Sequence, residues 1–94
     1  MVIGILTVSL YIPSSSSLKD KRHVLKSVKD RLGLGFNVSV AEVGQQDKWQ
    51  KSTLVVAHVG VTKPVVNSVL SNVLNALESY HNLEVINHEM ELLV

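Results

Sequence analysis

One stretch of the sequence, SLKDKRHVLKSVKDRL, gathers most of the side chains that could bind an anion. It runs from Ser17 to Leu32 and holds six of the nine lysines and arginines of the chain. In a helix with 100° per residue, four of these bases fall on one stripe about 80° wide beside the apolar face: Lys19, Arg22, Lys26 and Lys29. Such a stripe could contact the phosphates of RNA or another polyanion. The simpler interpretation, which we favour slightly, is a solvated helix face whose lysine stems cover the edge of the core.

The start of the same stretch is a second candidate anion site. Ser17 precedes the expected helix, and Lys21 and Arg22 follow in its first turns, where free backbone N–H groups attract negative charge. Together the three residues could hold one anion. Lys21, however, falls in the middle of the apolar face. The favoured alternative is therefore an aliphatic stem that carries its ammonium past the helix end into solvent.

Trp49 is the only tryptophan, and it lies in a polar segment between Lys48 and Lys51. Flanked by bases, its ring could stack on a nucleic-acid base or anchor a protein partner. We favour packing of the ring over the edge of the core, because a large apolar side chain gains most from burial.

Two common RNA-binding signatures are absent. Residues 52–59, STLVVAHV, lack the aromatic side chains on which an RRM stacks bases, and Gly33-Leu34-Gly35 lacks the spacing of a KH loop. If RNA is the partner, we expect recognition of its backbone and shape through the basic helix and loops.

The sequence offers no pattern typical of catalysis or metal binding. His23, His58, His81 and His88 have no metal-ligand spacing, and there is no cysteine. We expect His58 and His88 to approach each other across a sheet as hydrogen-bonded core or interface histidines. Glu42 has no neighbouring acid or nucleophile, and we expect it to pair with a base of the first helix. We therefore predict no enzyme, no cofactor and no metal.

Charge is unevenly distributed along the 94 residues. The net charge is +1, but residues 1–63 hold nine bases and four acids, whereas residues 64–94 hold four acids and no base. This asymmetry suggests a basic and an acidic face. The lack of cysteine fits a reducing cytoplasm. The apolar N-terminus has no basic residue before it and is too short to span a bilayer, so we expect no membrane contact.

Hydrophobic periodicity predicts four strands and two helices. The strands are expected over residues 2–12, 36–43, 52–61 and 83–94, the last with Ile86, His88, Met90 and Leu92 on one side. The helices are expected over 18–32 and from 63 to about 80. Ser17 with Asp20, and Thr62 with Pro64, mark the helix starts. Gly33 and Gly35 should end the first helix, one of them in a left-handed conformation.

The order βαββαβ predicts a single domain, residues 1–94, of the ferredoxin-like α+β class. We expect a four-stranded antiparallel sheet with both helices on one face. The other face would be too apolar to stand comfortably in water. The sheet could therefore associate with a second copy as a homodimer, or curl and be covered by loops in a monomer.

Three motifs in order, SLKDKRHVLKSVKDRL, FNVSVAEV and QDKWQ, resemble the YlxP-like family of small uncharacterised bacterial proteins. The resemblance covers nearly the whole chain and implies a ferredoxin-like fold without an established catalytic activity. Genes of this family often lie beside those for ribosome maturation and translation initiation, which implies a role with RNA or the ribosome.

We therefore expect a cytoplasmic, non-enzymatic protein that contacts RNA or a ribosomal particle through the basic stripe. Two alternatives stay open. One is a dimeric module that binds a small anion or metabolite at the Ser17 helix start. The other is a protein–protein adaptor that uses Trp49 and the sheet.

Overall fold

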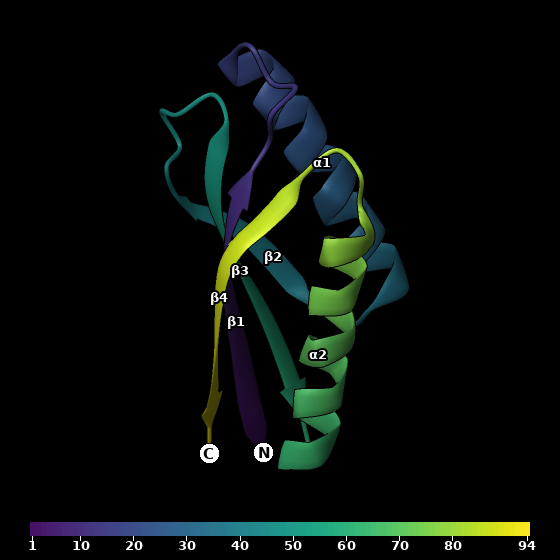
Figure 1. The fold of residues 1–94 in the computed structure, drawn as a ribbon. Coiled ribbons are helices and arrows are strands. Elements are labelled where there is room, and N and C mark those ends of the chain that lie inside the picture. Colours follow the sequence, from purple (N-terminus) through teal and green to yellow (C-terminus); the bar gives the residue numbers. More distant parts are fainter.

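The computed structural model describes residues 1–94 and has the predicted order of elements. In chain order these are β1 (Val2–Tyr11), α1 (Leu18–Gly35), β2 (Ser39–Gly44), β3 (Lys51–Gly60), α2 (Lys63–Ser79) and β4 (Glu84–Leu93). The strands form one sheet in the order β2-β3-β1-β4, and all neighbours are antiparallel. Both helices cover the same face of the sheet (Figure 1). The predicted ferredoxin-like α+β fold is confirmed.

The core lies between the sheet and the two helices. Along β1, Leu6, Val8 and Leu10 are fully buried, and the residues between them are half-buried. This alternation follows from the two-residue period of a strand, which sends successive side chains to opposite faces. From the helices, Leu25, Val28 and Leu32 of α1 and four residues of α2 meet this face: Val66, Leu70, Val73 and Leu77.

Helix α2 approaches the sheet closely because two strand residues beneath it are glycines. A Cβ on Gly60 would stand 2.7 Å from Val66 Cγ2. A Cβ on Gly4 would collide with Val66 and would stand 2.6 Å from Leu70 Cδ1. At both positions the absent side chain is what lets a branched residue of the helix rest on the backbone of the strand.

Helix α1 begins where the sequence predicts. Ser17 is the N-cap, and its Oγ accepts a hydrogen bond from Asp20 N at 3.0 Å. The reciprocal bond differs from a regular capping box. The Asp20 carboxylate reaches Ser16 instead of Ser17, and it accepts from Ser16 N at 3.1 Å and from Ser16 Oγ at 2.8 Å.

The prediction for the end of α1 is wrong. The helix continues through Gly33 to Gly35, and no glycine has a positive φ. Phe36 follows with an extended backbone, and its N–H donates to Leu32 O at 2.9 Å. Phe36 packs against the core, and the chain turns from α1 toward β2 without a left-handed residue.

A β-bulge changes the predicted pattern of β4. Ser9 pairs with Asn87, but the next residue, Leu10, pairs with Val85, so Ile86 is the extra residue. Ile86 is consequently 59% exposed. The expectation that it shares the apolar side with Met90 and Leu92 is therefore wrong, since the bulge breaks the two-residue alternation between them.

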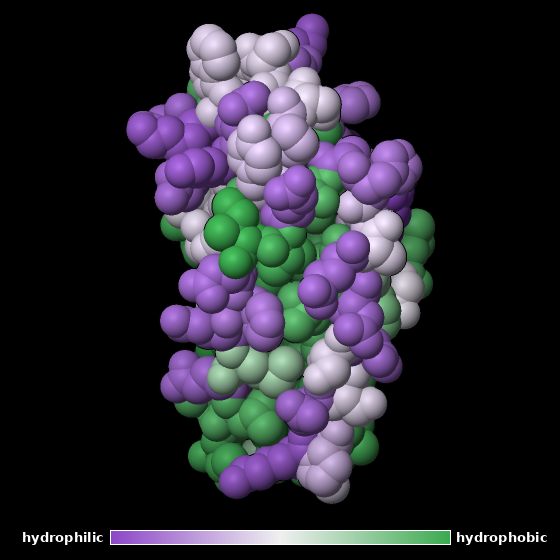
Figure 2. Space-filling view, in the orientation of Figure 1, coloured by the Kyte–Doolittle hydropathy of each residue, from purple (hydrophilic) through white to green (hydrophobic).

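The face of the sheet opposite the helices is uncovered. Its centre carries half-buried apolar side chains of β1 and β3, including Ile3, Ile5 and Val55, and Val59 is 58% exposed. Figure 2, which looks toward β4 and α2, also shows hydrophobic side chains between hydrophilic ones on the surface. Neither helix is long and apolar enough to cross a membrane.

Candidate functional site

The bases of the predicted stripe stand at the surface of α1. Lys19, Arg22 and Lys26 are exposed, and Lys29 is half-buried. Lys26 also forms an ion pair with Asp30 one turn later, with Nζ 3.0 Å from Oδ2. Both of these side chains are well exposed, so the pair is weak and leaves the ammonium accessible to a partner.

A contact of Arg31, on the flank of α1 away from the stripe, shows in which direction the stripe faces. The Arg31 guanidinium lies 5.2 Å from the ring centroid of Tyr80, the C-cap of α2. Around the axis of α1, the buried residues lie between Arg31 on one flank and the bases of the stripe on the other flank. Helix α1 packs beside β2, which is an edge strand. The stripe therefore faces away from α2, toward the β2 edge of the sheet.

Acidic side chains collect at the other edge. Glu84, Glu89 and Glu91 are all exposed on β4. Because β2 and β4 are the two edge strands of the sheet, the charge asymmetry along the chain becomes a separation of charge across the molecule. A polyanion approaching the α1 side meets an attractive field without close carboxylates from β4.

The anion site predicted at the helix start does not form, because the protein's own side chains take its hydrogen-bond donors. Ser17 Oγ already caps Asp20 N, and the Asp20 carboxylate occupies the adjoining donors of Ser16. These bonds lower the pKa of Asp20, first through the Ser16 hydroxyl and then through the Ser16 N–H. A carboxylate thus stands where the anion was expected, and it would repel one.

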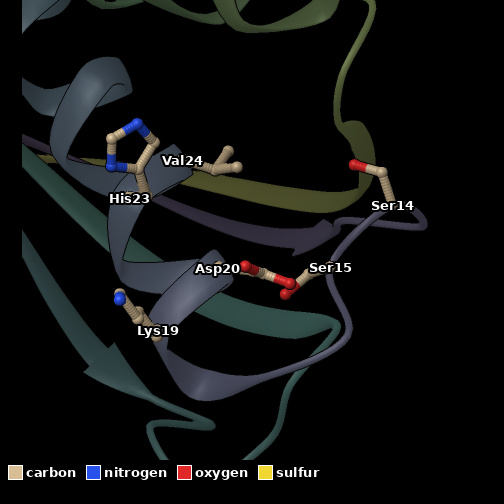
Figure 3. A pocket seen from close by; sticks show the side chains of 6 residues that line it. All are labelled: Ser14, Ser15, Lys19, Asp20, His23 and Val24. Carbon is tan, nitrogen blue, oxygen red and sulfur yellow. The ribbon is translucent and has the colours of Figure 1, made fainter.

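A shallow pocket of about 490 Å³ adjoins this helix start. Figure 3 shows the side chains of Asp20 and Ser15 next to each other in this view, with Ser14 farther along the loop and His23 on α1. Two other shallow pockets lie along α1 and at the β2–β3 loop, and each is lined by one hydrophobic residue among polar ones.

Lys21 does not face solvent, contrary to both interpretations of the sequence. Its side chain is 1% exposed, and its Nζ lies 3.0 Å from Glu42 Oε2. The same ammonium donates to three backbone carbonyl oxygens, those of Gln45 at 2.7 Å and Gln46 at 3.2 Å in the loop between β2 and β3 and that of Lys51 at 3.1 Å at the start of β3. Its charge is used inside the protein, so Lys21 cannot join Ser17 and Arg22 around an anion.

The expectation that Glu42 pairs with a base of the first helix is confirmed. Besides the contact with Lys21, Glu42 Oε2 accepts a hydrogen bond from Ser52 Oγ at 2.7 Å. No buried side-chain nitrogen or oxygen atom in the protein lacks a partner. Burying the Lys21 charge is therefore compatible with the fold, since every polar group brought in with it is satisfied. We name the Lys21–Glu42–Ser52 group the clamp.

Trp49 lies in the loop held by the clamp and is 58% exposed. The expectation that it packs over the core edge is wrong. Together with Lys48, Lys51 and two glutamines, Gln45 and Gln50, it lines a shallow pocket. The three residues predicted to contact a partner are thus neighbours on one surface.

The histidines do not form a cluster. His58 is opposite Gly4 and His88 opposite Val8, on the two strands that flank β1, about 13 Å apart along its length. Their expected approach is therefore wrong. His58 is 8% exposed, and its Nδ1 lies 2.7 Å from Asn37 O, as expected for a hydrogen-bonded core histidine. No group of three or more His, Cys, Asp or Glu side chains could hold a metal ion.

Fold and surface together define a class of protein: a small ferredoxin-like α+β domain with one basic helix flank and a separate acidic edge. A family model described as "Protein of unknown function (DUF503)" matches residues 3–90. The chain is also 35% identical over 83 residues to "Uncharacterized protein YlxP" of Bacillus subtilis (strain 168), over 88% of this chain and 90% of that protein. The protein belongs to the DUF503 family, and the resemblance seen in its motifs is confirmed.

Proposed function

We propose that this protein is a cytoplasmic, non-enzymatic factor that binds RNA, free or in a ribosomal particle, through the phosphate backbone. The binding surface is the stripe of α1, and its four bases each contact a phosphate or lie close to one. Neutralising phosphates releases counterions, which supplies a favourable and salt-dependent contribution to affinity.

The observation that supports this proposal is the separation of charge between the two edges of the sheet. Arg22 and Lys26 stand exposed on the flank of α1 that faces the β2 edge, while the carboxylates of β4 stand at the opposite edge. A helix face that is basic only for solubility needs no such separation, because surface charges of both signs serve equally well. Recognition would be of backbone and shape, which fits the lack of aromatic residues on β3 itself.

The test is a salt series of binding to ribosomal RNA and to ribosomal subunits. The variant Arg22→Gln/Lys26→Gln/Lys29→Gln removes three positive charges from the stripe. The control Ser68→Glu/Asn72→Glu/Asn75→Glu adds three negative charges to exposed positions of α2, so both variants have the same net charge. We expect the stripe variant alone to bind weakly, with a salt slope reduced by about 2–3. Equal losses of RNA affinity in both variants, or no binding of the wild type at low salt, would contradict the proposal.

A second role, self-association through the open sheet face, is favoured by a separate observation. Apolar side chains of two neighbouring strands stand side by side on that face, with Ile3 opposite Val59 and Ile5 opposite Ala57. A second copy could cover them and remove apolar surface from water. The face lies opposite the helices, so a dimer would leave both basic stripes exposed for RNA.

A further inference from the structure

The loop between β2 and β3 presents Trp49 to solvent on a backbone that is fixed from several sides. On one side, the Lys21 ammonium holds the carbonyl oxygens of Gln45 and Lys51, at 2.7 Å and 3.1 Å. These two residues lie before and after the tip of the loop. The clamp therefore ties both ends of the loop to the start of α1.

The residue after Trp49 provides a second attachment. Gln50 Nε2 donates to Pro13 O and to Ser15 O, both at 3.1 Å, and Gln50 O accepts from Ile12 N at 2.7 Å. The β1–α1 connection is thus joined to the β2–β3 loop directly beside Trp49. Only the tip, from Asp47 to Trp49, extends beyond these attachments.

The turn that leads into the tip has an uncommon conformation. Gln45 has a φ of 62°, and it is the only non-glycine residue with a positive φ. Its carbonyl oxygen accepts from both Lys21 Nζ and Lys48 N, at 2.7 Å and 3.0 Å. Such a conformation persists where surrounding contacts enforce it. A loop already held in place loses little entropy when a ligand binds to it.

Charge and composition of this surface indicate what kind of ligand it suits. The lining of the shallow pocket at Trp49 is otherwise polar or basic, with Lys48 and Lys51 as its charged members. A protein hot spot usually lies in a well-packed, fully desolvated pocket whose surroundings exclude water from the aromatic anchor. Stacking on a nucleobase needs only one accessible ring face, with cations nearby for the adjoining phosphates.

The Trp49 surface and the N-terminal part of the basic stripe lie at the same end of the molecule. Lys21, which holds the loop, directly precedes Arg22 of the stripe, and Figure 1 shows the β2–β3 loop and the start of α1 at the same end of the sheet. A nucleic-acid strand that follows α1 toward its N-terminus would reach the loop next.

We propose that Trp49 stacks on an unpaired base of an RNA whose backbone runs along α1, with Lys48 and Lys51 at the flanking phosphates. The preferred ligand is then a single strand or a bulged helix rather than a regular duplex. This inference rests on the proposed function, and it adds the class of RNA and a second contact surface. The clamp and Gln50 act as positioning residues for the ring.

The test compares two RNAs that differ in one feature: a regular duplex, and the same duplex with a single bulged nucleotide. Trp49 is the only tryptophan, so its fluorescence reports on the ring alone. We expect the wild type to prefer the bulged RNA, with quenching that the duplex does not cause. Trp49→Ala should lower affinity for the bulged RNA by about 5- to 100-fold and leave affinity for the duplex nearly unchanged. Trp49→Phe should retain part of the preference.

Gln50→Ala tests the positioning role without touching the buried charge. It removes the bonds to Pro13 and Ser15, and we expect a smaller preference for the bulged RNA with quenching still present at saturation. Unchanged preference in this variant would contradict the positioning role.

The outcomes separate this inference from the proposed function. If the stripe variant loses affinity for both RNAs while Trp49→Ala changes neither, RNA binding stands and the stacking role is overturned. If the wild type binds neither RNA at low salt, both are overturned. Equal quenching by duplex and bulged RNA would also overturn the stacking role, because an unpaired base would then not be required.

Discussion

Lys21 and Glu42 form an ion pair at 3.0 Å that joins α1 to β2, and the lysine side chain in it is 1% exposed. A buried ammonium is costly unless its donors are all satisfied. Here the carboxylate, two carbonyls of the β2–β3 loop and the carbonyl of Lys51 at the start of β3 satisfy it. The pair does not merely join two elements. It also determines where the loop that carries Trp49 lies.

We expect Lys21→Met to lower the free energy of unfolding by about 3–5 kcal/mol, because it leaves the Glu42 carboxylate and the loop carbonyls without their cation. Lys26→Met is the matched control, since Lys26 also forms a 3.0 Å ion pair but its side chain is 75% exposed. That variant should change stability by about 0.5 kcal/mol or less. Urea denaturation of both variants measures the difference. Similar losses in the two would show that burial of the pair is unimportant.

Much of the fold could be predicted from the sequence because its signals are local. The alternation along β1 and the spacing of Val66, Leu70 and Val73 in α2 each repeat over a few residues, and burial follows them. The order βαββαβ is then compatible with only a few sheet topologies. The basic stripe was predicted for the same reason, since helix periodicity alone determines which bases share a flank.

The clamp could be predicted only in part. Pairing of Glu42 with a base was expected from its charge, but the other acceptors of Lys21 are backbone carbonyls 24 to 30 residues away, for which no residue type is a signal. A lysine at the centre of an apolar helix face was the one available clue. The exposure of Trp49 was missed for the same reason, because it depends on how the loop is held.

Substitution by alanine should destabilise the protein at Gly4 and stabilise it at Gly33. Gly4→Ala places a methyl group against Val66 and Leu70, and we expect a loss of about 1–3 kcal/mol in the free energy of unfolding. Gly33 lies in α1, where an added Cβ would meet no other side chain within 4 Å. Gly33→Ala should therefore stabilise the protein by about 0.5–1 kcal/mol, since alanine is the better helix former. Thermal unfolding of the two variants provides the comparison. A stabilising Gly4→Ala would mean that α2 is free to move outward.

We expect Asp20 to make the stability of the protein depend on pH. Its pKa is lowered below the ordinary 3.8, mainly by the hydrogen bond from the Ser16 hydroxyl. The folded protein thus holds the proton less tightly than the unfolded chain, so the contribution is present above pH 3.8 and is lost as pH falls through the folded value. We expect Asp20→Asn to lower the Tm near neutral pH, and we expect this difference from the wild type to shrink as the pH falls below 3.8. Ser16→Ala should lose part of the same contribution, and a pH-independent difference for Asp20→Asn would contradict this account.

Self-association through the open sheet face should be sensitive to one exposed valine. Val59 is 58% exposed on β3 opposite Ile3, and Val65 is 53% exposed at the start of α2, away from that face. Val59→Asp would bury a charge in the interface and should weaken dimerisation at least about tenfold, whereas Val65→Asp should leave it unchanged. Sedimentation velocity over a concentration series measures both, with thermal unfolding as a check that the variants are folded. A wild type that remains monomeric at about 100 μM, where a dimer with micromolar Kd would be nearly complete, would rule out a stable dimer through this face.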